Sequence, residues 1–251
     1  MVLAICLAPR TVLGQPFTIP SGSMEPTLLV GDYVIVNKFA YGWSRHSIPF
    51  DPPLPAGRLM GAEPRRGDVV VFKKPGDGRT DVIKRVVGLP GDRIRMVEGV
   101  LTLNDRPVSR RLVDSAVEAP WGQPMAVGRF RETLPDGRSY VTNSYGSATP
   151  GGNTGVYVVP AGCYFMMGDN RDNSLDSRFD PGPIAKGQSS CPWSGAPGAN
   201  LPPEIGMGFV PFDDLVGRAE LVAWSFEPGA SVFKPWTLAT HLRRGRAFLR
   251  L

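Results

Sequence analysis

The chain has 251 residues, a formal net charge of +5, 30 glycines and 26 prolines. This length is enough for one sizeable domain or for a core with an inserted subdomain, and the many turn-forming residues predict a mostly β protein. Only two histidines are present and the three cysteines show no C-x-x-C spacing, which argues against a histidine-based metal hydrolase and a zinc or redox site. We expect no metal and no cofactor.

Two cysteines leave an alternative open. Cys163 and Cys191 would pair if the fold brought them together in an oxidising compartment, whereas isolated cysteines are commonly free and buried. Since no spacing motif links the two, we expect free thiols.

The N-terminus is apolar but short. Residues 1–8 are apolar, and Pro9 and Arg10 follow at once. A spanning helix needs about 20 apolar residues, and a secretory signal carries its positive charge before the apolar run. We therefore expect residues 1–14 to be a residual membrane-anchor segment, either the end of a spanning helix whose beginning is missing or a short interfacial anchor.

Short apolar runs predict the strands in chain order. They cover residues 32–39, 69–73, 81–87, a hairpin of 93–97 and 100–103, then 156–159, 164–167 and 219–226. Residues 41–64 are too rich in proline for a regular element. The end of the chain, residues 241–251, mixes four arginines with apolar residues and predicts a short basic amphipathic helix.

A Ser-Gly-Ser turn is the first candidate for chemistry. Ser21, Gly22 and Ser23 lie between two prolines, and glycine lets the backbone approach a reacting group closely. This suits a nucleophile whose backbone N–H points at a carbonyl. An ordinary Ser/Gly turn is an equal alternative when the segment is read alone.

A serine hydroxyl needs a base near neutral pH, and Lys84 is the candidate. Alternation along residues 81–87 places Lys84 on one face with Val82 and Val86. Desolvation among valines lowers a lysine pKa and leaves neutral amine that takes a proton. An edge-strand lysine that reaches into water is the competing interpretation.

A third polar segment, residues 168–178, follows an apolar strand. A calcium loop needs acidic or amide ligands at alternate positions and a central glycine. Arg171 and Leu175 break that pattern. We expect a hydrogen-bonded turn with Asp176 and Arg178 as an ion pair, which would either stiffen a wall of the site or serve structure alone.

Together the three segments resemble the bacterial type I signal peptidases, membrane-bound serine proteases that remove signal peptides from exported preproteins. The resemblance runs through five collinear motifs: PSGSMEPTLLVGDYVIVNKFAYG (20–42), RRGDVVVF (65–72), DVIKRVVGLPGD (81–92), GDNRDNSLDSR (168–178) and FVPFDDLVGRA (209–219). It implies a signal-peptidase-type fold of antiparallel sheets with a smaller inserted β-rich subdomain.

The resemblance also implies roles. Ser23 matches the nucleophile and Lys84 the general base, while Ser21 joins the Ser23 N–H in the oxyanion hole. Ser174 matches the serine that hydrogen-bonds and orients the lysine, and Asp176 and Arg178 match the supporting ion pair. The family has two shallow substrate pockets, which take small side chains at the first and third positions before the cut. The apolar residues that line these pockets match Phe17, Ile19, Pro20 and Ile83.

The resemblance and the predicted strands together suggest the following domains. Residues 15–98 and 155–226 form the catalytic core, and residues 99–154 form the inserted subdomain. Residues 180–207 are a loop insertion whose role stays open, and residues 227–251 are a basic tail that we expect to contact anionic lipid.

The partners implied are signal peptides of preproteins, bound by strand addition, and membrane lipid. The resemblance places the protein in the bacterial inner membrane with its catalytic domain on the periplasmic face, and we expect a monomer. No nucleic acid is expected, because the arginines are mostly scattered and the strongest basic cluster lies far in sequence from most aromatics.

Other Ser-Lys enzymes are the main competitors. Ser231 and Lys234 fit the S-x-x-K pattern of penicillin-binding proteins, but the S-D-N and K-T-G partners are absent. Self-cleaving repressor proteases carry a DNA-binding domain, for which the residues before Ser23 leave no room.

Overall fold

A computed structural model describes residues 15–44, 57–119, 122–193, 205–230 and 234–251. Strands dominate these ranges, and every ladder between named strands is antiparallel. The prediction of a mostly β protein is confirmed. Within the described ranges no helix is long and apolar enough to cross a membrane. The predicted anchor, residues 1–14, lies outside them.

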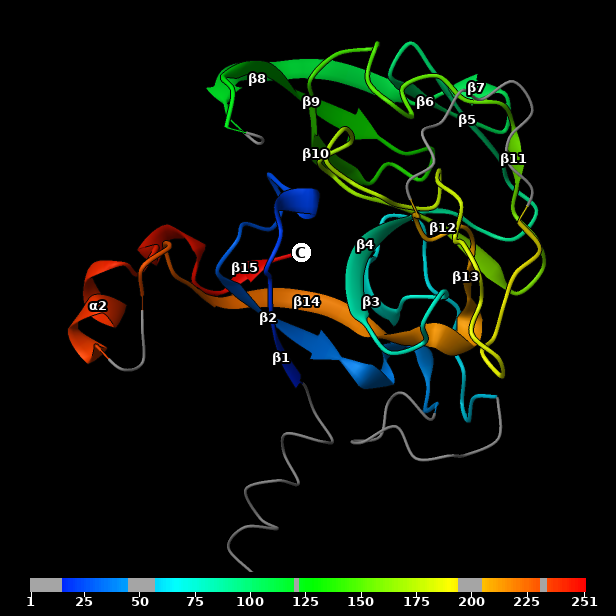
Figure 1. The fold of residues 1–251 in the computed structure, drawn as a ribbon, viewed down its shortest axis with the longest axis horizontal. Coiled ribbons are helices and arrows are strands. Elements are labelled where there is room, and N and C mark those ends of the chain that lie inside the picture. The colour runs from blue at the N-terminus through cyan, green and yellow to red at the C-terminus, as the bar shows by residue number, and fades with distance from the viewer. Residues whose placement is uncertain (1–14, 45–56, 120–121, 194–204, 231–233) are drawn as a thin grey trace, which may run out of the picture.

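The main sheet has eight strands in the order β1-β2-β14-β3-β4-β12-β13, with β15 added to β14 (Figure 1). Its strands are β1 (Gln15–Thr18), β2 (Asp32–Asn37), β3 (Val69–Lys73), β4 (Asp81–Gly88), β12 (Cys163–Met167), β13 (Val210–Pro211), β14 (Leu215–Ser225) and β15 (Leu249–Arg250). β3 and β12 are buried along their whole length, as their uninterrupted apolar runs predict. The sheet therefore has core on both faces of its centre.

A four-stranded sheet extends from the end of β4. It has the order β11-β5-β6-β7, with β5 (Arg93–Val97), β6 (Val100–Leu103), β7 (Arg106–Pro107) and β11 (Tyr157–Val158). The predicted hairpin is confirmed with its two-residue turn, where Glu98 and Gly99 have φ of 48° and 73°. Positive φ at both central residues suits the twist of the paired strands.

A three-stranded sheet, in the order β10-β9-β8, lies over the segment that follows β1 (Figure 1). Its strands are β8 (Ser109–Glu118), β9 (Met125–Thr133) and β10 (Ser139–Ser144). The sequence predicted only a polar, turn-rich region here. β8 has mostly exposed residues on both faces, so its sequence lacks the alternation that marks a strand with one buried face.

The expected division into a core and an inserted subdomain stays a prediction. The pairing of β5 with β6 crosses the boundary at residues 98–99. The three-stranded sheet, residues 109–144, is the part of 99–154 that would form the inserted unit.

Helical segments are few and short in the described ranges. They are η1 (Gly22–Met24), η2 (Lys38–Tyr41), η4 (Phe212–Asp214), α2 (Pro235–Thr240) and η5 (Arg244–Arg246). The amphipathic helix predicted for residues 241–251 is wrong, since this segment forms η5 and β15. Tertiary hydrogen bonds decide its conformation: Arg246 donates to Asp32, and Arg243 donates to the carbonyl of Val30.

Cys163 and Cys191 form a disulfide, so the expectation of free thiols is wrong. Cys163 is on β12, and Cys191 lies in the loop insertion 180–207, with a Cα–Cα distance of 6.2 Å. Only the fold brings these residues together, because 28 positions separate them in the chain.

Candidate active site

The segment between β1 and β2 presents Ser23. Its ends are tied together, because Ile19 N–H donates to Asp32 O at 2.9 Å and Gly31 N–H donates to Ile19 O at 3.0 Å. Met24 and Leu28 are fully buried and anchor the segment to the core. Ser23, in the single turn η1, is left facing a cavity with its hydroxyl partly exposed.

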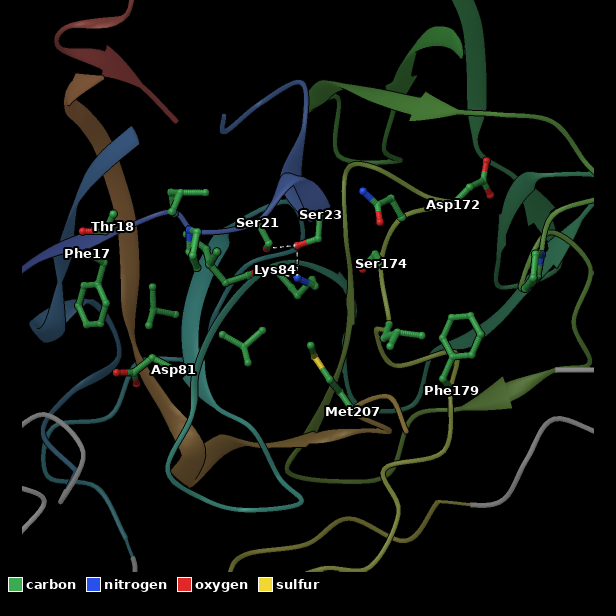
Figure 2. A pocket seen from close by; sticks show the side chains of 18 of the residues that line it. Phe17, Thr18, Ser21, Ser23, Asp81, Lys84, Asp172, Ser174, Phe179 and Met207 are labelled. Carbon is green, nitrogen blue, oxygen red and sulfur yellow. Dashed lines mark hydrogen bonds between the residues drawn. The ribbon is translucent and has the colours of Figure 1, made fainter. Parts of the chain in front are cut away.

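Lys84 meets Ser23 from β4. Register with β3 places Lys84 opposite Val70, and only 3% of the lysine is exposed. Its Nζ donates to Ser23 Oγ at 2.7 Å and to the carbonyl of Ile83 at 2.9 Å (Figure 2). A buried strand therefore holds an amine within proton-transfer distance of a hydroxyl.

Burial lowers the pKa of Lys84 to about 8, because the ammonium loses hydration among apolar neighbours. The carboxylates of Asp176 and Asp169 oppose this by favouring the charged form. Desolvation is the larger effect, so a substantial fraction of Lys84 is neutral at mildly alkaline pH.

The hydroxyl of Ser21 lies 3.4 Å from that of Ser23, on the same side of the turn (Figure 2). Ser21 has an extended backbone, with φ −134° and ψ 154°, and caps η1 without a side-chain hydrogen bond to it. Its hydroxyl is therefore available to a group that approaches Ser23.

The polar turn after β12 packs directly on the backbone of Ser23. Asn170 N–H donates to Ser23 O at 3.1 Å. Gly168 lies so close that a Cβ there would be 2.5 Å from both Ser23 O and Ser174 Oγ. Glycine is required here because no side chain fits between the two segments.

Ser174 lines the same cavity but does not form the hydrogen bond to Lys84 that the resemblance implies. Its hydroxyl is buried and has no hydrogen-bond partner among the described residues. A buried unpaired hydroxyl is rare and is free to bond a substrate, a water or a moving side chain.

Asp176 and Arg178 form the expected ion pair, and both are almost fully buried. Arg178 Nε donates to Asp176 Oδ1 at 2.8 Å and Nη2 donates to Oδ2 at 2.9 Å. Asp176 also accepts the backbone N–H of Gly168 at 3.0 Å. The pair thus fixes the glycine that contacts Ser23, and Arg178 holds the pKa of Asp176 below its usual value, although burial alone would raise it.

A cavity of about 760 Å³ opens beside the Ser23–Lys84 pair. The four residues predicted for the substrate pockets all line it: Phe17, Ile19, Pro20 and Ile83. It is also lined by residues that sequence reasoning did not single out, including Asp81, Thr149, Pro150, Leu175, Phe179 and Met207. The last of these belongs to the loop insertion, and no local pattern indicated that it reaches the site.

Two buried ion pairs that sequence reasoning missed brace the turn. Arg85 pairs with Asp169, and Arg171 pairs with Glu132 of β9 at 2.9 and 2.5 Å. Arg85, Asp169 and Arg171 lie within the two motifs that contain Lys84 and Ser174, whereas Glu132 lies outside them. The pairings have no local sequence signal, because Asp169 is 84 positions from Arg85 and Glu132 is 39 positions from Arg171.

Comparison with known proteins identifies the family of the chain. A family model described as signal peptidase, peptidase S26, matches residues 1–224. Signal peptidase I of Rickettsia typhi is 37% identical over an alignment of 234 residues, which covers 89% of this chain and 77% of the relative. Signal peptidase I of Rickettsia rickettsii is 34% identical over an alignment of 262 residues, which covers 97% of this chain and 88% of the relative. The chain belongs to the signal peptidase I family.

It is therefore a serine endopeptidase, and the family's reaction is the removal of signal peptides. A crystal structure of a signal peptidase I from Enterococcus faecalis is similar at 21% identity, with a TM-score of 0.30, over 62% of this chain and 97% of its own. The resemblance recognised in the five sequence motifs is confirmed at the level of the family.

Proposed function

We propose that the protein cleaves preproteins after small residues, in the pattern Ala-x-Ala, with Ser23 as nucleophile and Lys84 as general base. One observation supports this above the others: a buried amine with its pKa lowered to about 8 lies 2.7 Å from a serine hydroxyl at the wall of a cavity. An adjacent general base activates a serine hydroxyl as a nucleophile, and the amine of Lys84 is in position to act as that base.

The reaction is a two-step acyl transfer. Neutral Lys84 takes the proton of Ser23 Oγ as Oγ attacks the scissile carbonyl, and the resulting oxyanion accepts hydrogen bonds from Ser21 and from the Ser23 N–H. The Lys84 ammonium then gives its proton to the leaving amine, which breaks the C–N bond. Water, deprotonated by Lys84, then attacks the acyl carbonyl. The C–Oγ ester bond breaks, Lys84 returns the proton to Ser23 Oγ, and the signal peptide leaves with a free carboxylate.

The substrate would bind as an extended strand along β1 and β4. Ile19 and Ile83 lie next to the reactive pair and would bound a shallow pocket for the residue before the cut. Phe17 and Pro20 line the same cavity and would contribute to the pocket for the third residue before the cut. Shallow apolar pockets select small side chains because larger ones do not fit.

Membrane association completes the proposal. A signal peptide is presented at a bilayer, so the enzyme would work on the periplasmic face of the inner membrane, attached through the apolar residues 1–14 and through contact of the basic C-terminal segment with anionic lipid. A tethered enzyme meets a tethered substrate at a raised effective concentration. Salt-insensitive association with acidic-lipid vesicles would count against the electrostatic part of this contact.

Peptide cleavage tests the dyad. In detergent, the protein should cut a preprotein-like peptide with Ala-x-Ala before the cut, and either Ser23→Ala or Lys84→Ala should abolish cleavage. Lys234→Ala is the matched control, because Lys234 is exposed and belongs to the competing S-x-x-K pattern. Wild-type cleavage rates in either dyad variant would show that the assignment is wrong.

A further inference from the structure

The cavity beside Ser23 has a second apolar wall that the two small-residue pockets do not use. Leu175, Phe179 and Met207 line it, and in Figure 2 Met207 and Phe179 lie across the cavity from Phe17. Phe179 and Met207 are 3% and 7% exposed, so both are part of a packed surface and not of a loose rim. An apolar wall of this kind favours an apolar side chain, because contact removes both surfaces from water.

Met207 is held in place by the core. Its side chain packs in the buried cluster that contains Val86 and Met166. Its backbone N–H donates to the carbonyl of Asp176 at 3.2 Å, and the next residue, Gly208, donates to the carbonyl of Phe179 at 3.0 Å. The loop insertion 180–207 thus returns to the core directly beside the Asp176–Arg178 ion pair.

The described part of the insertion is tied down at two further points. Ala185 N–H donates to Gly76 O at 3.1 Å, in the turn that joins β3 to β4, and Cys191 is bonded to Cys163 of β12. These two attachments join the insertion to the turn between β3 and β4 and to β12, the next strand after β4 in the sheet. They hold its chain path against the hairpin that carries Lys84.

The size of the cavity leaves space for a further substrate group beside this wall. Two methyl-sized side chains fill only a small part of about 760 Å³, a volume in the range of sites that bind several groups of a ligand. We infer that Met207, together with Phe179, contacts an apolar preprotein side chain outside the first and third positions before the cut and sets a preference for it. This inference rests on the proposed function and adds a specificity determinant that the insertion supplies.

Paired peptides test the inference. Each pair shares Ala-x-Ala and differs by Ala or Leu at one other position near the cut. For at least one position, kcat/KM of the wild type should be higher for Leu, and Met207→Ala should reduce this Leu-to-Ala ratio about tenfold. Met207→Val, which shortens the side chain but keeps it apolar, should give an intermediate ratio. Met60→Ala is the matched control, because Met60 is 92% exposed, and it should leave the ratio unchanged.

Two outcomes would overturn the inference while leaving the proposed function intact. One is cleavage of the Ala-x-Ala peptides with no preference for Leu at any position. The other is a preference that folded Met207→Ala and Met207→Val, checked by thermal unfolding, leave at the wild-type value. If the wild type cleaves none of the peptides, the proposed function itself fails, and this inference with it.

Discussion

Arg85 and Asp169 form a bidentate ion pair, with Nε to Oδ1 at 2.8 Å and Nη2 to Oδ2 at 2.6 Å. Arg85 follows Lys84 on β4, and Asp169 precedes the residue that donates to Ser23 O. The pair therefore connects the strand that carries the amine to the turn that supports the hydroxyl. Thr27, from the Ser23 segment, also donates to Asp169 at 2.5 Å.

Removal of Asp169 should be strongly destabilising. Asp169→Ala leaves the buried Arg85 without a counter-ion, which costs about 3–5 kcal/mol in the free energy of unfolding. Asp114→Ala is the control, since its pair with Arg129 at 3.7 Å is half exposed and contributes less than about 1 kcal/mol. Urea unfolding of both variants checks the difference, and equal losses would contradict the special role of the Arg85 pair.

Activity should depend on pH through Lys84. The ammonium is inactive, so kcat/KM should rise with pH through the lysine pKa of about 8. Asp176 favours the ammonium, so Asp176→Asn should lower this pKa and move the acid limb to lower pH. The pH profiles of wild type, Asp176→Asn and the exposed control Asp136→Asn measure the shift. A limb that moves to higher pH, or a flat profile in the wild type, would contradict the assignment.

Ser174→Ala should separate function from stability. The buried hydroxyl makes no hydrogen bond in the described structure, so its removal should leave the thermal midpoint unchanged or slightly raised. If Ser174 orients Lys84 during turnover, kcat should nevertheless fall about tenfold or more. Ser177→Ala provides the contrast, because Ser177 accepts the N–H of Met166 at 2.9 Å, and its loss should cost about 1–3 kcal/mol. Full activity in a stable Ser174→Ala protein would remove the positioning role.

Arg246 should support the nucleophile segment from the C-terminus. It donates to Asp32 at 2.6 Å and to the carbonyl of Thr27 at 2.8 Å, and the Asp32 side chain is fully buried. Arg246→Ala should therefore destabilise the protein by about 2 kcal/mol and lower kcat, whereas exposed Arg244→Ala should do neither. Calorimetry and peptide cleavage on both variants give the comparison, and identical behaviour of the two would show that the C-terminal arginines do not brace this segment.

Local sequence patterns predicted a strand that is buried along its whole length and a hairpin with a short turn. The buried run Val69–Lys73 and the hairpin turn at Glu98 and Gly99 are as predicted, because continuous burial and a two-residue turn each leave a local signature. The strand β8 was missed because both of its faces are mostly exposed. The C-terminal helix was wrong because arginine side chains found hydrogen-bond partners more than 200 positions away, as the separation of 214 between Arg246 and Asp32 illustrates.

Local sequence alone supplies the chemical components of the protein: a Ser-Gly-Ser turn, a lysine among valines and a polar turn, within a chain of the signal peptidase I family. Their arrangement arises only when distant segments fold against one another. Folding placed Lys84 Nζ 2.7 Å from Ser23 Oγ, left the Ser174 hydroxyl unpaired among the described residues, joined Cys163 to Cys191 and brought Met207 to the cavity. Residue identity sets what a side chain can do, whereas distance and desolvation arise from packing between segments far apart in the chain.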